Sequence, residues 1–73
     1  SANASESKIF LKVALNTNKD DDFYLYRSIQ DEMGNIHEKF QQTFKGLKVE
    51  FGEFIVHKNK AGSIYTINGK HPA

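Results

Sequence analysis

Residues 23–44 read FYLYRSIQDEMGNIHEKFQQTF, which is two apolar-rich arms on either side of a short polar segment at residues 31–34. That segment ends in Gly34, and a glycine can take the left-handed backbone conformation that closes a tight turn between two strands. With this loop, apolar and oppositely charged positions match across the two arms, which supports a single register. The stretch therefore predicts a β-hairpin with these facing residues: Ile29 with Ile36, Arg27 with Glu38, Tyr26 with Lys39, Leu25 with Phe40, and Tyr24 with Gln41.

A helix within residues 22–45 is the competing interpretation of the same stretch. Asn35 followed by Glu38 resembles a helix capping box, and apolar residues recur at four-residue steps from Ile36. A continuous helix would hold Gly34 in its middle, which costs about 1 kcal/mol relative to alanine. We therefore favour the hairpin, and an α+β fold with one helix in this range stays as the alternative.

Three further stretches have the pattern of strands. Every second residue from Ile9 to Leu15 is Ile, Leu or Val, which is the period of a strand with one buried face. Residues 48–58 alternate in the same way, with a change of phase at Gly52 that indicates a β-bulge. Residues 64–67 supply a last short strand. With the hairpin, these stretches predict an all-β fold, a single small five-stranded antiparallel barrel or sheet that is OB-like or SH3-like.

Length and composition set the domain organisation. The 73 residues suffice for one small domain, and nine Phe and Tyr side chains supply its core. Residues 1–7 are small and polar, so we expect a disordered tag or linker there and a single small β domain over residues 8–73. The sequence holds no cysteine and therefore no disulfide or thiolate metal site. It also lacks the run of about 18 apolar residues that a membrane-spanning helix needs.

The charge is small and unevenly distributed. The net charge is +1, with four basic and seven acidic residues in 1–38, and six basic and two acidic residues in 39–73. This is not the density of positive charge that is typical of a nucleic-acid-binding domain. The three aspartates at residues 20–22 lack the alternating ligands and the later glutamate of a calcium loop, so we interpret them as a solvated acidic loop.

No arrangement of residues with the spacing of a catalytic or metal site is present in the sequence. His37, His57 and His71 are far apart, without ligand spacing or a carboxylate partner, and we expect them to be surface histidines. The serines have no nucleophile-elbow context, and there is no glycine-rich phosphate loop. We therefore predict that the protein is not an enzyme and needs no cofactor and no metal.

Several landmarks occur in the order found in one family of small proteins. They are Tyr24-x-Tyr26, Asp31-x-x-Gly34, Lys39-Phe40, Leu47-Lys48, Gly52-x-Phe54-Ile55, Lys58 and Ile64. In this order the chain resembles the YxeA-like family of exported bacterial proteins, which are OB-fold-like and have no established activity. The resemblance implies a module of unknown function with an extracytoplasmic location, and it offers no functional residues to transfer.

Two functions remain, from different classes. The first is a structural or protein-interaction module with a protein or peptide partner, whose contact surface is made by Tyr24, Tyr26 and the strand edges. The second is an OB-like domain that binds single-stranded nucleic acid, with Tyr24, Tyr26 and Phe10 stacked on bases. In that alternative the phosphates would be bound by the following basic residues: Arg27, Lys39, Lys45 and Lys58. We favour the interaction module, because tyrosines commonly cover a sheet and lysines commonly keep a small domain soluble.

Overall fold

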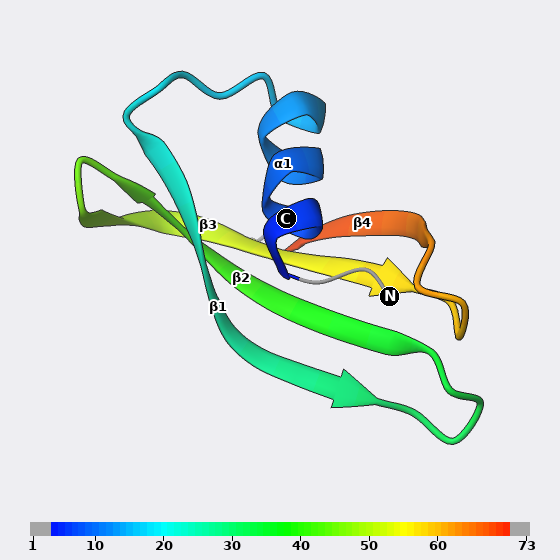
Figure 1. The fold of residues 1–73 in the computed structure, drawn as a ribbon. Helices are drawn as coiled ribbons and strands as arrows, with labels where there is room; N and C mark the ends of the chain where they lie inside the picture. Colours follow the sequence, from blue (N-terminus) through cyan, green and yellow to red (C-terminus); the bar gives the residue numbers. More distant parts are fainter. Residues whose placement is uncertain (1–3, 71–73) are drawn as a thin grey trace.

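The computed structural model describes residues 4–70, which form one helix and four strands (Figure 1). The elements in chain order are α1 (Ala4–Ala14), β1 (Asp21–Gln30), β2 (Ile36–Phe44), β3 (Leu47–Lys58) and β4 (Ile64–Lys70). The strands form one sheet in the order β1-β2-β3-β4, and each strand is antiparallel to its neighbours. Figure 1 shows α1 lying against one side of the twisted sheet. We call this side the covered face and the opposite side the open face.

The fold is mostly β, as predicted, but the five-stranded OB-like or SH3-like barrel is wrong. Within residues 4–70 there are four strands, and β1 and β4 are the two edges of an open sheet. A barrel would need these edges to pair with each other. The structure instead buries the apolar face of the sheet beneath a helix, which is the other common way to complete a small β layer. No helix in this part of the chain is long and apolar enough to cross a membrane.

The strand predicted from Ile9 to Leu15 is wrong, because this segment belongs to α1 and continues into the turn that follows it. Ser7 and Leu11, one helical turn apart, are both fully buried, whereas Ile9 and Val13 are 63% and 77% exposed. The alternating residues thus point around a helix and do not line one face of a strand. The helix begins at Ala4, so the boundary expected after residue 7 lies inside it; residues 1–3 lie outside the described residues.

The end of α1 is set by a left-handed residue. Asn16 has φ 51°, a conformation that asparagine tolerates better than most residues. Its N–H donates to the carbonyl of Val13, and the N–H of Thr17 donates to the carbonyl of Lys12, at 3.2 Å each. These two bonds make a Schellman motif, which satisfies carbonyls that the last helical turn leaves unpaired.

The core lies between α1 and the covered face. It consists of one buried side chain from each of α1, β1, β2 and β3: Leu11, Phe23, Phe40 and Val56. Partly buried residues complete it: Leu25, Phe54, Ile64 and Ile67. The rings of Phe23 and Phe54 meet edge to face, with 6.0 Å between their centroids. α1 contributes one apolar side chain to this core and leaves much of its own apolar surface exposed.

The β1–β2 hairpin is confirmed, and the helix considered within residues 22–45 is not formed. The predicted register holds for Leu25 with Phe40 and for Tyr24 with Gln41. Beyond them a bulge at Tyr26 shifts the pairing by one residue, so that Arg27 faces Lys39. The predicted pairs between this bulge and the loop are therefore wrong: Glu38 pairs with Ser28, and His37 pairs with Ile29.

The loop of this hairpin is one residue longer than predicted and spans residues 31–35. The N–H of Asp31 donates to the carbonyl of Asn35 at 2.8 Å, and the N–H of Gly34 donates to the carbonyl of Asp31 at 3.0 Å. Gly34 has φ 86°, which confirms the predicted left-handed turn residue.

The predicted irregularity at Gly52 is present, although its physical basis differs. Between the pairs Gln41 with Glu53 and Thr43 with Lys48, four residues of β3 lie opposite a single residue of β2. The positive φ in this bulge, 62°, belongs to Phe51 and not to Gly52. A Cβ on Gly52 would lie 2.9 Å from Cβ of Gln42, so glycine is needed here for close approach.

Candidate functional site

The open face carries the candidate site, and its residues follow from the alternation of each strand. Phe23, Phe40 and Val56 point into the core, so their neighbours along the strands point away from α1. The open face therefore includes the following residues: Tyr24, Tyr26, Arg27, Ile29, His37, Lys39, Gln41, Lys48, Glu53, Ile55, His57, Thr66 and Asn68. Antiparallel sheets commonly leave one face in solvent, and Tyr24 and Tyr26 are two large side chains exposed on this face.

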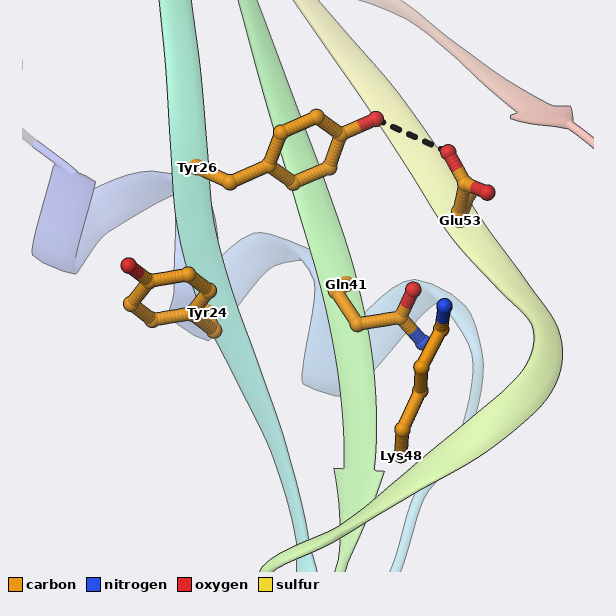
Figure 2. Close-up of a pocket in the computed structure, with 5 residues that line it drawn as sticks. All are labelled: Tyr24, Tyr26, Gln41, Lys48 and Glu53. Carbon is orange, nitrogen blue, oxygen red and sulfur yellow. Dashed lines mark hydrogen bonds between the residues drawn. The ribbon is translucent and has the colours of Figure 1, made fainter.

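A pocket of about 370 Å³ lies on this face across β1, β2 and β3, lined by Tyr24, Tyr26, Gln41, Lys48 and Glu53. Figure 2 shows these five side chains on the near side of the strands, with the ribbon of α1 behind the sheet. The volume is at the lower end of the range for small-ligand sites, and the pocket is wide open to solvent. Its shape therefore suits a side chain presented by a partner surface better than an enclosed small molecule.

Hydrogen bonds fix three of the pocket side chains: Tyr26, Glu53 and Gln41. The hydroxyl of Tyr26 donates to Oε1 of Glu53 at 2.8 Å, and this bond raises the pKa of Tyr26 above its ordinary value. The amide of Gln41 donates to the backbone carbonyls of Gln42 and Val49, at 2.9 Å each. The pocket therefore presents two phenol rings, one ammonium and one carboxylate in a partly fixed arrangement. These groups offer apolar contact, hydrogen bonds and opposite charges, and the five lining residues include no activated nucleophile or acid–base pair.

The bulges create this arrangement. Tyr26 is the extra residue of the β1 bulge, so it extends the row begun by Tyr24 and reaches across β2 to Glu53. The β3 bulge turns the chain between Lys48 and Glu53 so that both side chains border the same hollow. Sequence reasoning found the two tyrosines. It missed Gln41 although the predicted register set it opposite Tyr24, and Lys48 and Glu53 depend on bulge geometry that the sequence does not specify.

The remaining predicted binding residues lie in different parts of the structure and do not form one surface. Lys39 lies on the open face, half-buried and opposite Arg27, which is exposed on β1. Lys45 lies in the β2–β3 turn, with its Nζ 5.5 Å from the centroid of the Phe44 ring. Lys58 is buried on the covered face, where its ammonium contacts Glu38.

The arrangement proposed for nucleic-acid binding is therefore split. Phe10 belongs to α1 and lies on the opposite side of the sheet from Tyr24 and Tyr26. It cannot share one base-stacking surface with them, and the buried ammonium of Lys58 cannot reach a phosphate on that surface. The geometry does not support the nucleic-acid alternative.

A buried polar cluster joins α1 to the sheet. The carboxylate of Glu38 accepts a hydrogen bond from the hydroxyl of Ser7 at 2.5 Å, and its Oε1 lies 3.0 Å from Nζ of Lys58. All three side chains are buried. The cluster connects α1, β2 and β3 on the covered face. It is a structural feature of the core, because nothing in it faces the open pocket.

The prediction that the histidines are separate surface residues is wrong for two of them. Nδ1 of His37 lies 2.7 Å from Nδ1 of His57, and Nε2 of His37 lies 2.9 Å from Oδ2 of Asp31. The β2–β3 register sets the two rings directly opposite each other. The third histidine, His71, lies outside the described residues. Among residues 4–70, no group of three His, Cys, Asp or Glu side chains has the geometry to hold a metal ion.

The fold is a small, mostly β module whose open face carries exposed tyrosines beside charged side chains. Residues 21–70, which span all four strands, match the family described as the Fungalysin/Thermolysin Propeptide Motif. The match covers more than half of the chain, and the chain belongs to that family. Comparisons with curated proteins and with solved structures give no match.

This match overturns the resemblance to the YxeA-like family. The landmarks that carried the resemblance are turn, bulge and strand residues, which recur in many antiparallel sheets. The first element also differs, because it is a helix here and not the first strand of a barrel.

Proposed function

We propose that this chain is a propeptide module that binds the catalytic domain of a fungalysin- or thermolysin-type peptidase and holds it inactive. Membership of the propeptide family supports this class of partner. In this proposal the chain acts by binding and not by catalysis. The observation that carries the proposal is the pocket on the open face, where Tyr24 and Tyr26 are exposed beside Lys48 and Glu53. A propeptide of an exported peptidase would act outside the cytoplasm, which agrees with the extracytoplasmic location favoured above.

The composition of this surface suits a protein partner. Tyrosine combines a large apolar ring with a hydrogen-bonding hydroxyl and is enriched at the centres of protein interfaces. The Tyr26 ring is already oriented by its bond to Glu53, so a partner would not need to immobilise it. Lys48 and Glu53 lie beside the rings and would fix the orientation of docking through their opposite charges.

Inhibition of peptide hydrolysis tests this proposal. The chain is titrated into a thermolysin-type and a fungalysin-type catalytic domain, each free of its own propeptide, and into a subtilisin-type serine peptidase as a control. We expect saturable inhibition of at least one of the first two enzymes and none of the serine peptidase. Equal effects on all three enzymes, or no inhibition of either metallopeptidase, would contradict the proposal.

A matched pair of variants locates the contact. Tyr26→Ala should weaken inhibition by about tenfold or more, because a buried aromatic residue at the centre of an interface commonly contributes about 2 kcal/mol. Phe10→Ala is the control, since Phe10 is an aromatic residue of similar exposure, 45% against 43% for Tyr26, on the opposite side of the sheet. We expect it to inhibit as strongly as the unmodified chain.

A further inference from the structure

Four side chains on the open face form a continuous row of hydrogen bonds from one edge of the sheet to the β1–β2 loop. Nδ2 of Asn68 on β4 lies 3.1 Å from Nε2 of His57 on β3. Nδ1 of His57 lies 2.7 Å from Nδ1 of His37 on β2, and Nε2 of His37 lies 2.9 Å from Oδ2 of Asp31. We call Asn68, His57, His37 and Asp31 the histidine row.

The chemistry of the two ends assigns the protons between them. The Asp31 carboxylate can only accept, so Nε2 of His37 carries a hydrogen and donates to it. The Asn68 amide nitrogen can only donate, so Nε2 of His57 is an acceptor and the hydrogen of that ring is on Nδ1. Nδ1 of His57 then donates to Nδ1 of His37. With both rings neutral, every atom in the row has one role and a partner.

Additional protons disrupt this assignment. A first additional proton on either ring leaves one hydrogen between the two Nδ1 atoms and places an N–H on Nε2 of His57. That N–H then opposes the Asn68 amide unless the amide rotates. A second proton places N–H groups on both Nδ1 atoms, which lie 2.7 Å apart, and two positive rings then face each other. Donor against donor and charge against like charge both disfavour that state.

The surroundings of the row decide whether the extra charge is compensated. From β1, the residue paired with His37 is the uncharged Ile29, and from β4, Thr66 is paired with His57. Tyr65, at a bulge in β4, places its ring 6.0 Å from the His57 ring. Two ammonium groups lie nearby and add positive charge: Lys39 is the next open-face residue of β2, and Lys60 packs against Gly34 in the loop that carries Asp31. Asp31 compensates one positive ring.

Burial and the neighbouring His37 lower the pKa of His57 below its ordinary value, and the hydrogen bond with His37 lowers the pKa of Asp31. For His57 the sign follows directly. A histidine whose pKa is depressed in the folded state contributes stability that is complete above its unfolded pKa of about 6.5, and this contribution is lost as the pH falls through the folded value.

We propose that the histidine row is a proton-sensitive latch, which holds the edge strand β4 and the β1–β2 loop to the sheet at neutral pH and releases them in acid. Within residues 4–70, β4 pairs with β3 alone, so the bond from Asn68 and the contact of Tyr65 with His57 are side-chain links that support it. The latch is a property of the isolated chain and does not depend on the peptidase. It lies on the same face as the pocket, at the other end of β2 and β3.

Native-state amide hydrogen exchange, followed by NMR at several pH values and corrected for the intrinsic exchange rate, tests the latch. Protection of the β4 amides that bond to β3 should fall by up to about tenfold for each pH unit below about 6.5, which is the linkage of one additional proton in the open state. Amides beside the β2–β3 turn, at the opposite end of the sheet, are the internal control and should keep their protection. Unchanged protection in β4 between pH 7.5 and 5.0 would overturn the proposal.

Three substitutions assign the effect to the pair. His57→Gln and His37→Gln should each abolish most of the pH dependence in β4, whereas His71→Gln, the same change at the third histidine, should retain it. A pH dependence that survives in both variants of the pair would overturn the proposal. Ring ¹⁵N chemical shifts of the unmodified chain provide a readout that needs no variant to fold. They should report hydrogen on Nδ1 of His57 and on Nε2 of His37 at neutral pH, and any other tautomer of His57 would contradict the latch.

Discussion

Glu38 shows how a single residue can change partners between sequence and structure. The register predicted from the sequence places this carboxylate opposite Arg27, as an oppositely charged pair on the same face as Leu25 and Phe40. The bulge at Tyr26 moves it opposite Ser28, and its side chain points to the covered face, where Lys58 and Ser7 contact it. A buried charge is costly unless it is paired and hydrogen-bonded, and this one is both. The contacts of Glu38 with Ser7 and Lys58 could not be predicted from the pattern of residue types, because both residues lie far from Glu38 in the sequence.

The buried pair should be sensitive to the loss of either partner. Glu38→Gln keeps the size of the side chain but leaves the Lys58 ammonium buried without its counter-charge. We expect it to lower the free energy of unfolding by about 3–5 kcal/mol, measured as a shift of the urea midpoint at constant slope. Replacing both partners, as in Glu38→Gln with Lys58→Met, should recover part of the loss.

The exposed pair Lys12 with Asp22, whose Nζ and Oδ1 are 3.6 Å apart, is the matched control. Lys12→Met should change stability by less than about 1 kcal/mol, because solvent screens an exposed ion pair. If Lys12→Met proved as costly as Glu38→Gln, burial would not be the cause, and our account of the cluster would fail.

Among the elements, α1 is the one for which the sequence pattern predicts the wrong type of structure, a strand in place of a helix. Ile, Leu and Val at every second position are typical of a strand. A helix can pack on a sheet through only two side chains one turn apart, and its other apolar residues then stay exposed. Leu11, fully buried, and Ser7 are enough to hold it there. The signal that could have identified the helix is Asn16, since asparagine is a common left-handed residue after a helix C-terminus.

Leu11 should therefore be the residue on which docking of α1 depends. Leu11→Ala should destabilise the fold by about 2–5 kcal/mol through lost burial and the cavity that remains. When the variant is unfolded with urea, its helical signal in circular dichroism should be lost at a lower urea concentration than its strand signal. Val13→Ala is the control in the same helix, because Val13 is 77% exposed and its truncation should change stability by about 0.5 kcal/mol or less. Equal effects would mean that α1 does not pack as described.

The strands were largely predictable, and their errors share one cause. The hairpin, its left-handed glycine, the β3 bulge and the last strand all follow from alternation and turn residues. The bulge at Tyr26 was not visible, because the residues on either side continue to alternate whether or not an extra residue is inserted. Because of that one extra residue, every predicted pair between Tyr26 and the loop is wrong, and the pairing of His37 with Ile29 could not be predicted.

At the scale of the whole molecule, the sequence predicted two of the five residues that line the pocket, Tyr24 and Tyr26, and not how the five are arranged. Their strand positions alone predicted that both tyrosines lie on one exposed surface, where they line the pocket. The grouping with Lys48 and Glu53, and the row that joins His37 to His57, depend on the register between strands distant in sequence. The two histidines are 20 residues apart, and nothing in their local sequence indicates that they face each other. Registers of this kind are set by packing and bulges, which the pattern of residue types does not encode.

The central claim is that the open face of this propeptide module binds a peptidase catalytic domain. NMR of the ¹⁵N-labelled chain, titrated with an unlabelled thermolysin- or fungalysin-type catalytic domain, tests it most directly. We predict the largest changes in the amide signals of β1, β2 and β3 around Tyr24, Tyr26 and Glu53, and little change in α1. Changes confined to α1, or none with either enzyme at saturating concentration, would contradict the account.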